Sequence, residues 1–207
     1  MAFVSAASAD DVIANGGFEL GTGTDATGWQ EVGTQPAQRD SSNPFSGQWA
    51  LKLEATGSPT AGPNSVGLQN SIEDGGLPSL QELSTVDISF QWASDFGPGG
   101  VASVAGRILD GTGNIVADTG VIPLPDNGGT YGLINLPTLN VPAFGPDPAD
   151  EYAVFVEFSA AAGAFDGSFS GGFVDDVVAT GTLVPEPASL ALLGAAGLAV
   201  ISRRRKA

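Results

Sequence analysis

The sequence predicts an all-β protein: a two-sheet sandwich, with jelly roll as the favoured topology, followed by a single short C-terminal transmembrane helix. Three observations lead to this fold class. Apolar and polar residues alternate over several segments, turn-forming clusters rich in Gly and Pro separate those segments, and one uncharged apolar run lies near the C-terminus. With 207 residues and 42% apolar content, the chain can bury the core of one domain.

Period-two alternation is clearest at 86–92, where every second residue from Val86 to Trp92 is apolar and would share one face of a half-buried strand. Segments 49–54 and 152–158 repeat the pattern, and Gly- and Pro-rich clusters at 97–100, 110–113 and 126–129 would turn the chain. About eight to ten short strands and no soluble helix make two packed sheets the expected architecture. Further strands are expected near 29–32, 101–109, 114–118, 131–136 and 173–180.

Charge and composition exclude several functions. The net charge is −16, and four of the seven Lys and Arg residues lie at 203–206, so the rest of the chain is strongly acidic and would repel nucleic acid. The chain contains no Cys and no His, which excludes thiol chemistry, the usual zinc sites and acid–base catalysis by histidine. No motif sets two carboxylates in a cleft. We therefore expect no enzyme, although paired carboxylates can hydrolyse glycosides.

The C-terminal apolar run covers 188–201 and is followed by a basic cluster at 203–206. As a helix it would span about 21 Å, less than the roughly 30 Å hydrocarbon core, so a buried or interfacial helix is the alternative. Its terminal position, its lack of charge and the basic cluster favour a membrane segment with the cluster in the cytoplasm. Pro185 and Pro187 would hold Glu186 in an extended conformation that a membrane enzyme could recognise.

Val184-Pro185-Glu186-Pro187, the small-residue helix and Arg203-Arg204-Arg205 together resemble the PEP-CTERM sorting signal of Gram-negative bacteria. The resemblance implies export, transient anchoring in the inner membrane, and processing by an exosortase, after which the protein is at the cell surface or extracellular. Such proteins often occur in bacteria that make exopolysaccharide.

Three regions are expected along the chain. Residues 1–9 resemble the end of a truncated signal peptide, with Ala7-Ser8-Ala9 as a cleavage site, or match it by accident. Residues 10–182 would form the β-sandwich, and 183–207 the sorting signal. Residues 181–187 are expected to form a flexible tether that packs against little.

The β-sandwich region also carries a family resemblance. Asn15-Gly16-Gly17-Phe18-Glu19 with Gly28-Trp29, the segment 45–53, and Phe173-Val174-Asp175-Asp176-Val177 resemble strands of jelly-roll carbohydrate-binding modules of the galactose-binding-like class. The resemblance implies a structural calcium site formed by the Gly17 carbonyl, Glu19 and one Asp of the Asp175-Asp176 pair. Strand alternation would let only one of the two Asp residues face that site. A solvated strand end is the alternative.

Sugar binding would need exposed aromatic platforms. Tyr131, beside a Gly-rich turn, and Trp29 are the candidates we select, while packing in the core is the alternative for both and for the other candidates, Trp49, Trp92 and Tyr152. Two hypotheses follow for the body: a module that binds surface polysaccharide, or a non-catalytic structural or adhesive envelope protein with no small-molecule ligand. Buried aromatic side chains would count against the first.

Overall fold

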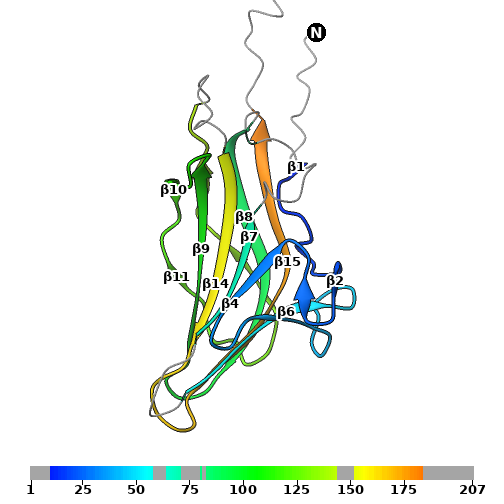
Figure 1. The fold of residues 1–207 in the computed structure, drawn as a ribbon, viewed down its shortest axis with the longest axis vertical. Helices are drawn as coiled ribbons and strands as arrows, with labels where there is room; N and C mark the ends of the chain where they lie inside the picture. Colours follow the sequence, from blue (N-terminus) through cyan, green and yellow to red (C-terminus); the bar gives the residue numbers. More distant parts are fainter. Residues whose placement is uncertain (1–9, 58–63, 71–79, 81–82, 144–151, 184–207) are drawn as a thin grey trace, which may run out of the picture.

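The computed structural model describes residues 10–57, 64–70, 80, 83–143 and 152–183, and its regular elements are all strands, with no α-helix in these ranges (Figure 1). The strands are β1 (Asp10–Asp11), β2 (Gly21–Thr22), β3 (Asp25–Ala26), β4 (Trp29–Gly33), β5 (Gln38–Asp40), β6 (Ala50–Thr56), β7 (Asn64–Asn70), β8 (Leu83–Phe96), β9 (Val101–Asp110), β10 (Ile115–Asp118), β11 (Ile122–Pro123), β12 (Gly132–Asn135), β13 (Leu139–Asn140), β14 (Tyr152–Ala161) and β15 (Phe169–Leu183).

The strands form two main sheets. Sheet 1 has the order β12-β8-β15-β6-β5, with β1 added to β15 and β13 added to β8. Sheet 2 has the order β10-β9-β14-β7-β4, with β11 added to β9, and β2 and β3 form a separate ribbon. The long strands alternate between the sheets along the chain, from β6 in sheet 1 to β7 in sheet 2, back to β8, and on to β9. This alternation is what a jelly roll requires, and the predicted all-β sandwich is confirmed.

The core lies between the two sheets, where the alternating strands meet. In β8 the side chains of Val86, Ile88, Phe90 and Trp92 are at most 1% exposed, as their alternation predicts. The ring of Phe158 in β14 meets Phe90 edge-on, with centroids 4.9 Å apart. Full burial of an aromatic or aliphatic side chain of this size stabilises the fold by about 1.5–3 kcal/mol, so this contact helps to hold the two sheets together.

Some strands were not expected from the sequence. β7 has the sequence NSVGLQN, which lacks a run of apolar residues, yet it pairs with both β14 and β4 inside sheet 2. β5 and the two-residue strands are too short to produce a periodic pattern. In contrast, β8 and β15 are 14 and 15 residues long, well beyond the segments that alternation indicated.

The prediction of a tether at 181–187 is wrong for its first three residues. Gly181 pairs with Val86 and with Asp10, and Leu183 pairs with Leu83, so β15 continues in the sheet to residue 183. The backbone groups there find partners in β1 and β8, which a loose tether would not have. The rest of the tether, the expected helix at 188–201 and the N-terminal segment 1–9 lie outside the described residues. In the described part of the chain, no helix has the length and apolarity to cross a membrane.

Candidate functional site

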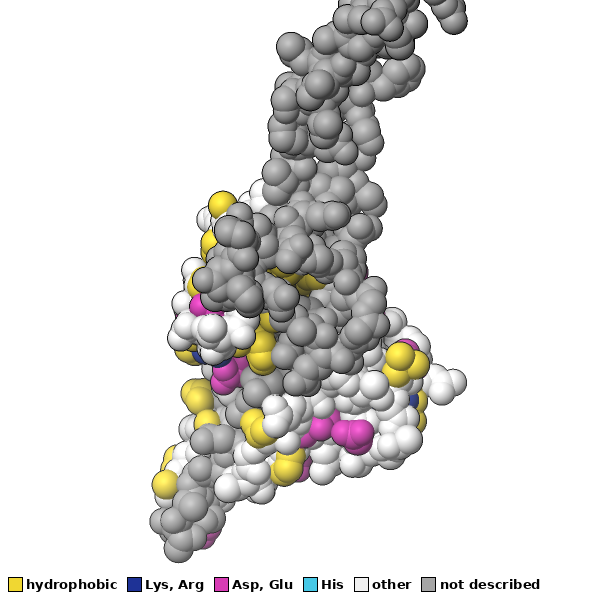
Figure 2. Space-filling model, turned by 45° about the horizontal axis from the view of Figure 1, so that its top comes forward, with side chains coloured by type: hydrophobic (Ala, Val, Ile, Leu, Met, Phe, Trp, Pro, Cys, Tyr) yellow, Lys and Arg dark blue, Asp and Glu magenta, His cyan; other side chains and the backbone are white. Residues whose placement is uncertain are grey.

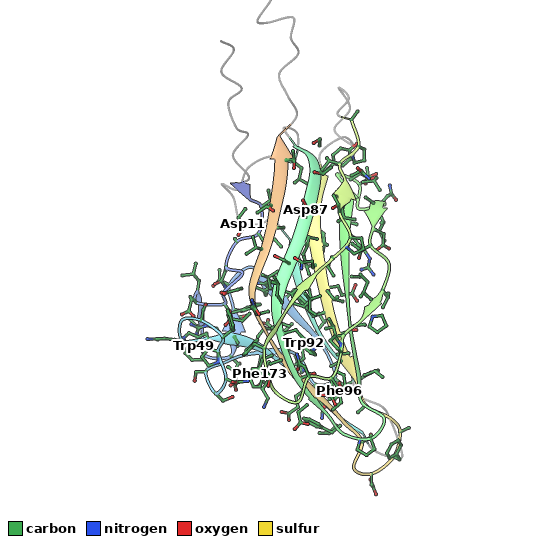
Figure 3. All side chains as sticks on the ribbon, turned by 180° about the vertical axis from the view of Figure 1, so that it is seen from behind. Asp11, Trp49, Asp87, Trp92, Phe96 and Phe173 are labelled. Atoms are coloured by element: carbon green, nitrogen blue, oxygen red, sulfur yellow. The ribbon has the colours of Figure 1, made fainter. Side chains whose placement is uncertain are left out.

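A groove crosses the outer face of sheet 1. Phe173, which lines it, lies in the half of the sandwich opposite to Asp11 and Asp87 (Figure 3). It consists of two adjoining hollows of about 280 and 230 Å³ that share Lys52 and Glu54 of β6. These two side chains point away from the core because the residues that alternate with them in β6 are buried. The larger hollow is lined by Asn43, Lys52, Glu54, Ala93, Ser94, Asp95, Gly129, Phe169, Gly171, Gly172 and Phe173, and the smaller by Gln35, Pro36, Gln38, Lys52 and Glu54.

Two partly buried phenylalanines of β15, Phe169 and Phe173, provide the aromatic surface of the larger hollow. The ring of Phe169 lies over Gly171, where an added Cβ would come within 2.5 Å of its Cζ. On the opposite face, an added Cβ at Gly172 would come within 2.2 Å of Trp92 Cη2. The Gly171-Gly172 pair therefore lets one aromatic ring pack on each face of β15, directly against the strand.

Two loops wall this groove and contact each other. Residues 43–49 form the first loop and 125–131 the second. The hydroxyl of Tyr131 donates to the carbonyl oxygen of Asn43 at 2.6 Å, and its ring lies 5.2 Å from that of Phe45. The second loop is held on β8, because Asn127 Oδ1 accepts from the backbone N–H of Ser94 at 2.7 Å and its Nδ2 donates to the carbonyl of Trp92 at 2.8 Å.

The polar side chains of the groove are amides and carboxylates, with one cation. Lys52 Nζ lies 2.5 Å from Glu54 Oε2, and the two side chains are 32% and 46% exposed. Asp95 lines the larger hollow, and Gln38 and Asn43 supply amide groups. This set can accept from and donate to neutral hydroxyl groups.

A second feature, the carboxylate cluster, lies behind the 43–49 loop and consists of Glu19, Asp175 and Asp176. Asp175 is fully buried, and its Oδ2 accepts from the N–H groups of Phe45 (2.8 Å) and Ser46 (3.0 Å). Burial raises the pKa of Asp175 despite these hydrogen bonds, and the neighbouring Asp176 raises it further.

Glu19 anchors the other end of the same loop. Its Oε1 accepts from the N–H groups of Gln48 (2.8 Å) and Trp49 (3.0 Å). The close approach of the Glu19 carboxylate to the loop depends on Gly47. This residue has φ of 59°, and an added Cβ there would lie 2.2 Å from Oε1 of Glu19. The carboxylate cluster thus fixes the loop that walls the groove.

The expectation that only one residue of the Asp175-Asp176 pair faces the site is wrong. The register of β15 against β8 shifts between Asp175 and Val178, and Asp176 has φ of 46°. This bulge breaks the alternation, so Asp175 bonds the backbone of the 43–49 loop while Asp176 Oδ1 accepts from the hydroxyl of Ser46 at 2.7 Å. Gly17 lies beside both carboxylates: an added Cβ there would be 3.7 Å from Asp176 Oδ1 and 3.9 Å from Asp175 Oδ1.

The structure brings together three of the four residues for which a calcium site is expected. Gly17, Asp175 and Asp176 are adjacent, while Glu19 is bonded to the far side of the loop. Among the described residues, no group of three or more Asp, Glu, His or Cys side chains is arranged closely enough to hold a metal ion.

Trp29, one of the two aromatic residues expected to bind sugar, is a core residue, and this prediction is corrected. It is 4% exposed, its ring packs 4.8 Å from that of Phe18 and 6.0 Å from that of Phe158, and its Nε1 donates to the carbonyl of Asn15 at 3.1 Å. A ring covered on both faces cannot stack on a sugar. The sequence did not distinguish it from an exposed platform because it follows a turn glycine, Gly28, at φ of 82°.

Tyr131, the other expected platform, is partly buried at the junction of the two loops, and burial raises the pKa of its hydroxyl. The remaining aromatic residues also have packing roles. Trp92 is fully buried, Tyr152 is partly buried against the core, and Trp49 is partly covered by Arg39, whose Cζ lies 3.7 Å from the ring centroid. Of the five aromatic candidates, none lines either hollow.

The sequence reasoning missed Phe169 and Phe173 as groove residues. Both alternate with Ser170, Gly172 and Val174, so period two places them on one face of β15. Alternation alone does not say which face is outward. In the structure, the burial of Val174 and of Trp92 beneath Gly172 assigns the phenylalanines to the outside.

Comparison with known proteins identifies the tail. The family model of the PEP-CTERM protein-sorting motif matches residues 183–206. The chain therefore carries this sorting signal, as its sequence predicted. Signals of this kind are generally processed by exosortases, and they indicate an exported, surface-directed protein. No curated protein sequence matches the chain.

Solved structures resemble the sandwich. The N-terminal CBM22-1–CBM22-2 tandem domain of Paenibacillus barcinonensis Xyn10C matches with a TM-score of 0.52 at 23% identity, over 84% of this chain and 50% of that chain. The enzymatically active domain of tailspike protein 4 from bacteriophage CBA120 matches with a TM-score of 0.53 at 16% identity, over 84% of this chain and 21% of that chain. This chain thus spans half or less of either protein. The likeness concerns the fold alone, that of a jelly-roll β-sandwich.

Proposed function

We propose that the protein is exported, processed at its C-terminal signal by an exosortase-type enzyme, and binds polysaccharide in the groove on sheet 1 without catalysing a reaction. The observation that carries the binding function is the groove itself: two phenylalanine rings at its floor, with amide and carboxylate side chains around them. Aromatic faces pack against the C–H groups of sugar rings, while amides and carboxylates bind the hydroxyl groups.

Affinity gel electrophoresis through a panel of soluble polysaccharides tests this function. The wild-type protein should be retarded by at least one polysaccharide, and Phe173→Ala should lose about two- to tenfold in affinity, because an aromatic stacking contact is worth about 0.5–1.5 kcal/mol. Phe165→Ala is the matched control, since Phe165 is 46% exposed and does not line the groove. If no polysaccharide retards the protein, or if Phe173→Ala binds as well as wild type, the alternative of a structural or adhesive envelope protein without a ligand replaces this function.

We propose further that residues 188–201 cross the inner membrane transiently, with the basic cluster at 203–206 in the cytoplasm, and that processing occurs near Pro185-Glu186-Pro187. The intact mass of the protein recovered from its host, with and without the sorting enzyme, tests this step. Loss of the segment beyond the motif should require the enzyme, and Glu186→Ala should prevent it. A full-length C-terminus in both strains would mean that the tail is a simple anchor.

Calcium binding at Gly17, Glu19, Asp175 and Asp176 is also part of the proposal. Two observations support it: Asp175 is buried beside Asp176, and within the described part of the chain neither has a basic partner. Carboxylate and backbone oxygens are the ligands that calcium prefers. The separate position of Glu19 means that it would have to release part of the loop or bind through a water molecule.

Thermal unfolding with calcium and with a chelator tests the cation site. A ligand at about 100 times its Kd stabilises the folded state by about 2.7 kcal/mol, so the Tm should rise by several degrees with calcium and not with magnesium. Asp176→Asn should abolish the rise, while Glu31→Gln, on β4 of sheet 2, should retain it. An equal Tm with calcium and with chelator would remove calcium from the proposal.

A further inference from the structure

The groove has a single cation among the described residues, Lys52, and a carboxylate pairs with it. Only three Lys or Arg residues precede position 203, namely Arg39, Lys52 and Arg107. Arg39 is 7% exposed and donates to the carbonyls of Phe18 (2.6 Å) and Glu19 (2.8 Å). Arg107 lies on β9 in sheet 2, where its guanidinium pairs with carboxylates of the same sheet. Lys52 is therefore the one basic residue of the described chain that reaches the groove.

Lys52 is neutralised within the groove. Its ammonium pairs with Glu54, which lines both hollows together with it, and Asp95 adds a second carboxylate to the larger hollow. The three ionised side chains sum to one negative charge. Acidic side chains also dominate the charged groups of the molecular face shown in Figure 2, which has little Lys or Arg. The net charge of the whole chain, −16, has the same sign as the charge of the groove.

We propose that this groove selects uncharged polysaccharides and excludes those bearing carboxylate or sulfate groups, with Glu54 and Asp95 as the residues that determine this specificity. The inference rests on the proposed binding function. A neutral sugar chain can donate hydroxyl hydrogens to both carboxylates, which only accept when ionised. An anionic chain would instead bring like charges together at a partly desolvated surface, where water screens them less than in bulk.

The ion pair gives Glu54 a double effect on specificity. Its carboxylate repels an anionic ligand and also occupies the Lys52 ammonium, which could otherwise bind that ligand. Replacing Glu54 by Gln removes the repulsion and frees the cation at the same point of the groove. Replacing Asp95 by Asn removes one further negative charge and retains a hydrogen-bonding group.

Pairs of polysaccharides with the same backbone and different charge test the inference. Hydroxyethylcellulose is compared with carboxymethylcellulose, and methyl-esterified homogalacturonan with its de-esterified form, by titration of the full chain at low and at high salt. For any sugar backbone that binds, the neutral polysaccharide should bind about tenfold more tightly than its anionic counterpart at low salt. The difference should shrink as salt screens the charges.

The double variant Glu54→Gln/Asp95→Asn should gain about tenfold in affinity for the anionic form and change little for the neutral one. Its control, Glu31→Gln/Asp118→Asn, makes the same change in net charge on sheet 2, and should gain less than twofold. An anionic form that binds the wild type as tightly as its neutral counterpart, or an equal gain in both double variants, would overturn the specificity and leave polysaccharide binding intact. Failure of every polysaccharide to bind would overturn the proposed function itself.

Discussion

Gly171 and Gly172 lie back to back in β15, and each removes a side chain from a different face of sheet 1. Gly172 makes room for the indole of Trp92 inside the core, and Gly171 makes room for the ring of Phe169 in the groove. Neither glycine is required by its φ angle, since neither is in the left-handed region. Both positions are explained by close packing, which tolerates no extra methyl group without a shift of its neighbours.

We expect Gly172→Ala to destabilise the fold by about 1–3 kcal/mol, because the new methyl group overlaps a fully buried indole. Gly171→Ala is the matched change on the outer face. It should cost less stability, since the partly exposed Phe169 ring can move, but should weaken polysaccharide binding by displacing that ring. Urea unfolding and affinity electrophoresis of both variants measure the two effects. Equal losses of stability would contradict this assignment of faces.

Strand β15 illustrates what the sequence of an element can and cannot predict. The apolar alternation of 86–92 sufficed to assign the buried face of β8, because each apolar residue there packs between the sheets. No comparable sequence pattern predicts the bulge in β15. Its irregular turn at Asp176 is accompanied by a hydrogen bond from the N–H of Val177 to the carbonyl of Gly16, about 160 residues earlier in the chain. Contacts at that separation determine the geometry of the carboxylate cluster and, through the 43–49 loop, of the groove.

The burial of Asp175 also makes the stability of the protein depend on pH. The folded chain holds the pKa of Asp175 above the usual 3.8, so between that value and the raised pKa the folded state binds more protons than the unfolded state. The contribution of Asp175 to stability must therefore fall as the pH rises through this interval. We expect the stability of the wild type relative to Asp175→Asn to decline as the pH rises from about 4 through the raised pKa, by at most about 1.4 kcal/mol per pH unit, and then to level off.

Urea unfolding across this range, with a chelator present, measures that difference. Asp110→Asn serves as the control: hydrogen bonds, first from the side chain of Thr112 and then from Asn114, lower the pKa of Asp110 to about 2. The contribution of Asp110 to the free energy of unfolding is present above pH 3.8 and is lost only toward pH 2. Plotted against pH, the free energies of unfolding of Asp110→Asn and of the wild type should therefore run parallel above about pH 5. If the free energy of unfolding of Asp175→Asn also ran parallel to that of the wild type, the pKa of Asp175 would not be raised.

At the scale of the whole molecule, the sandwich closes at Leu183, where the sorting signal begins. A chain that ends at residue 183 should have the same Tm as the full-length protein, because the strands of both sheets are retained. A chain that ends at Thr180 should unfold at a lower temperature, because it loses the pairing of Gly181 with β1 and of 181–183 with β8. Thermal unfolding followed by circular dichroism distinguishes the two. An unchanged Tm for the shorter chain would mean that the end of β15 contributes nothing.

Strand β15 runs along the long axis of the molecule (Figure 1) and joins the groove on sheet 1 to the start of the sorting signal. Phe169 and Phe173 lie in its first part, and Leu183 ends it. Fourteen steps of about 3.3 Å give the strand a length of about 45 Å, so it serves as a stiff spacer. While the tail is held in the membrane, the proposed groove would bind polysaccharide well outside the lipid headgroups. Cleavage of the tail beyond residue 183 would then release the protein with its polysaccharide still bound.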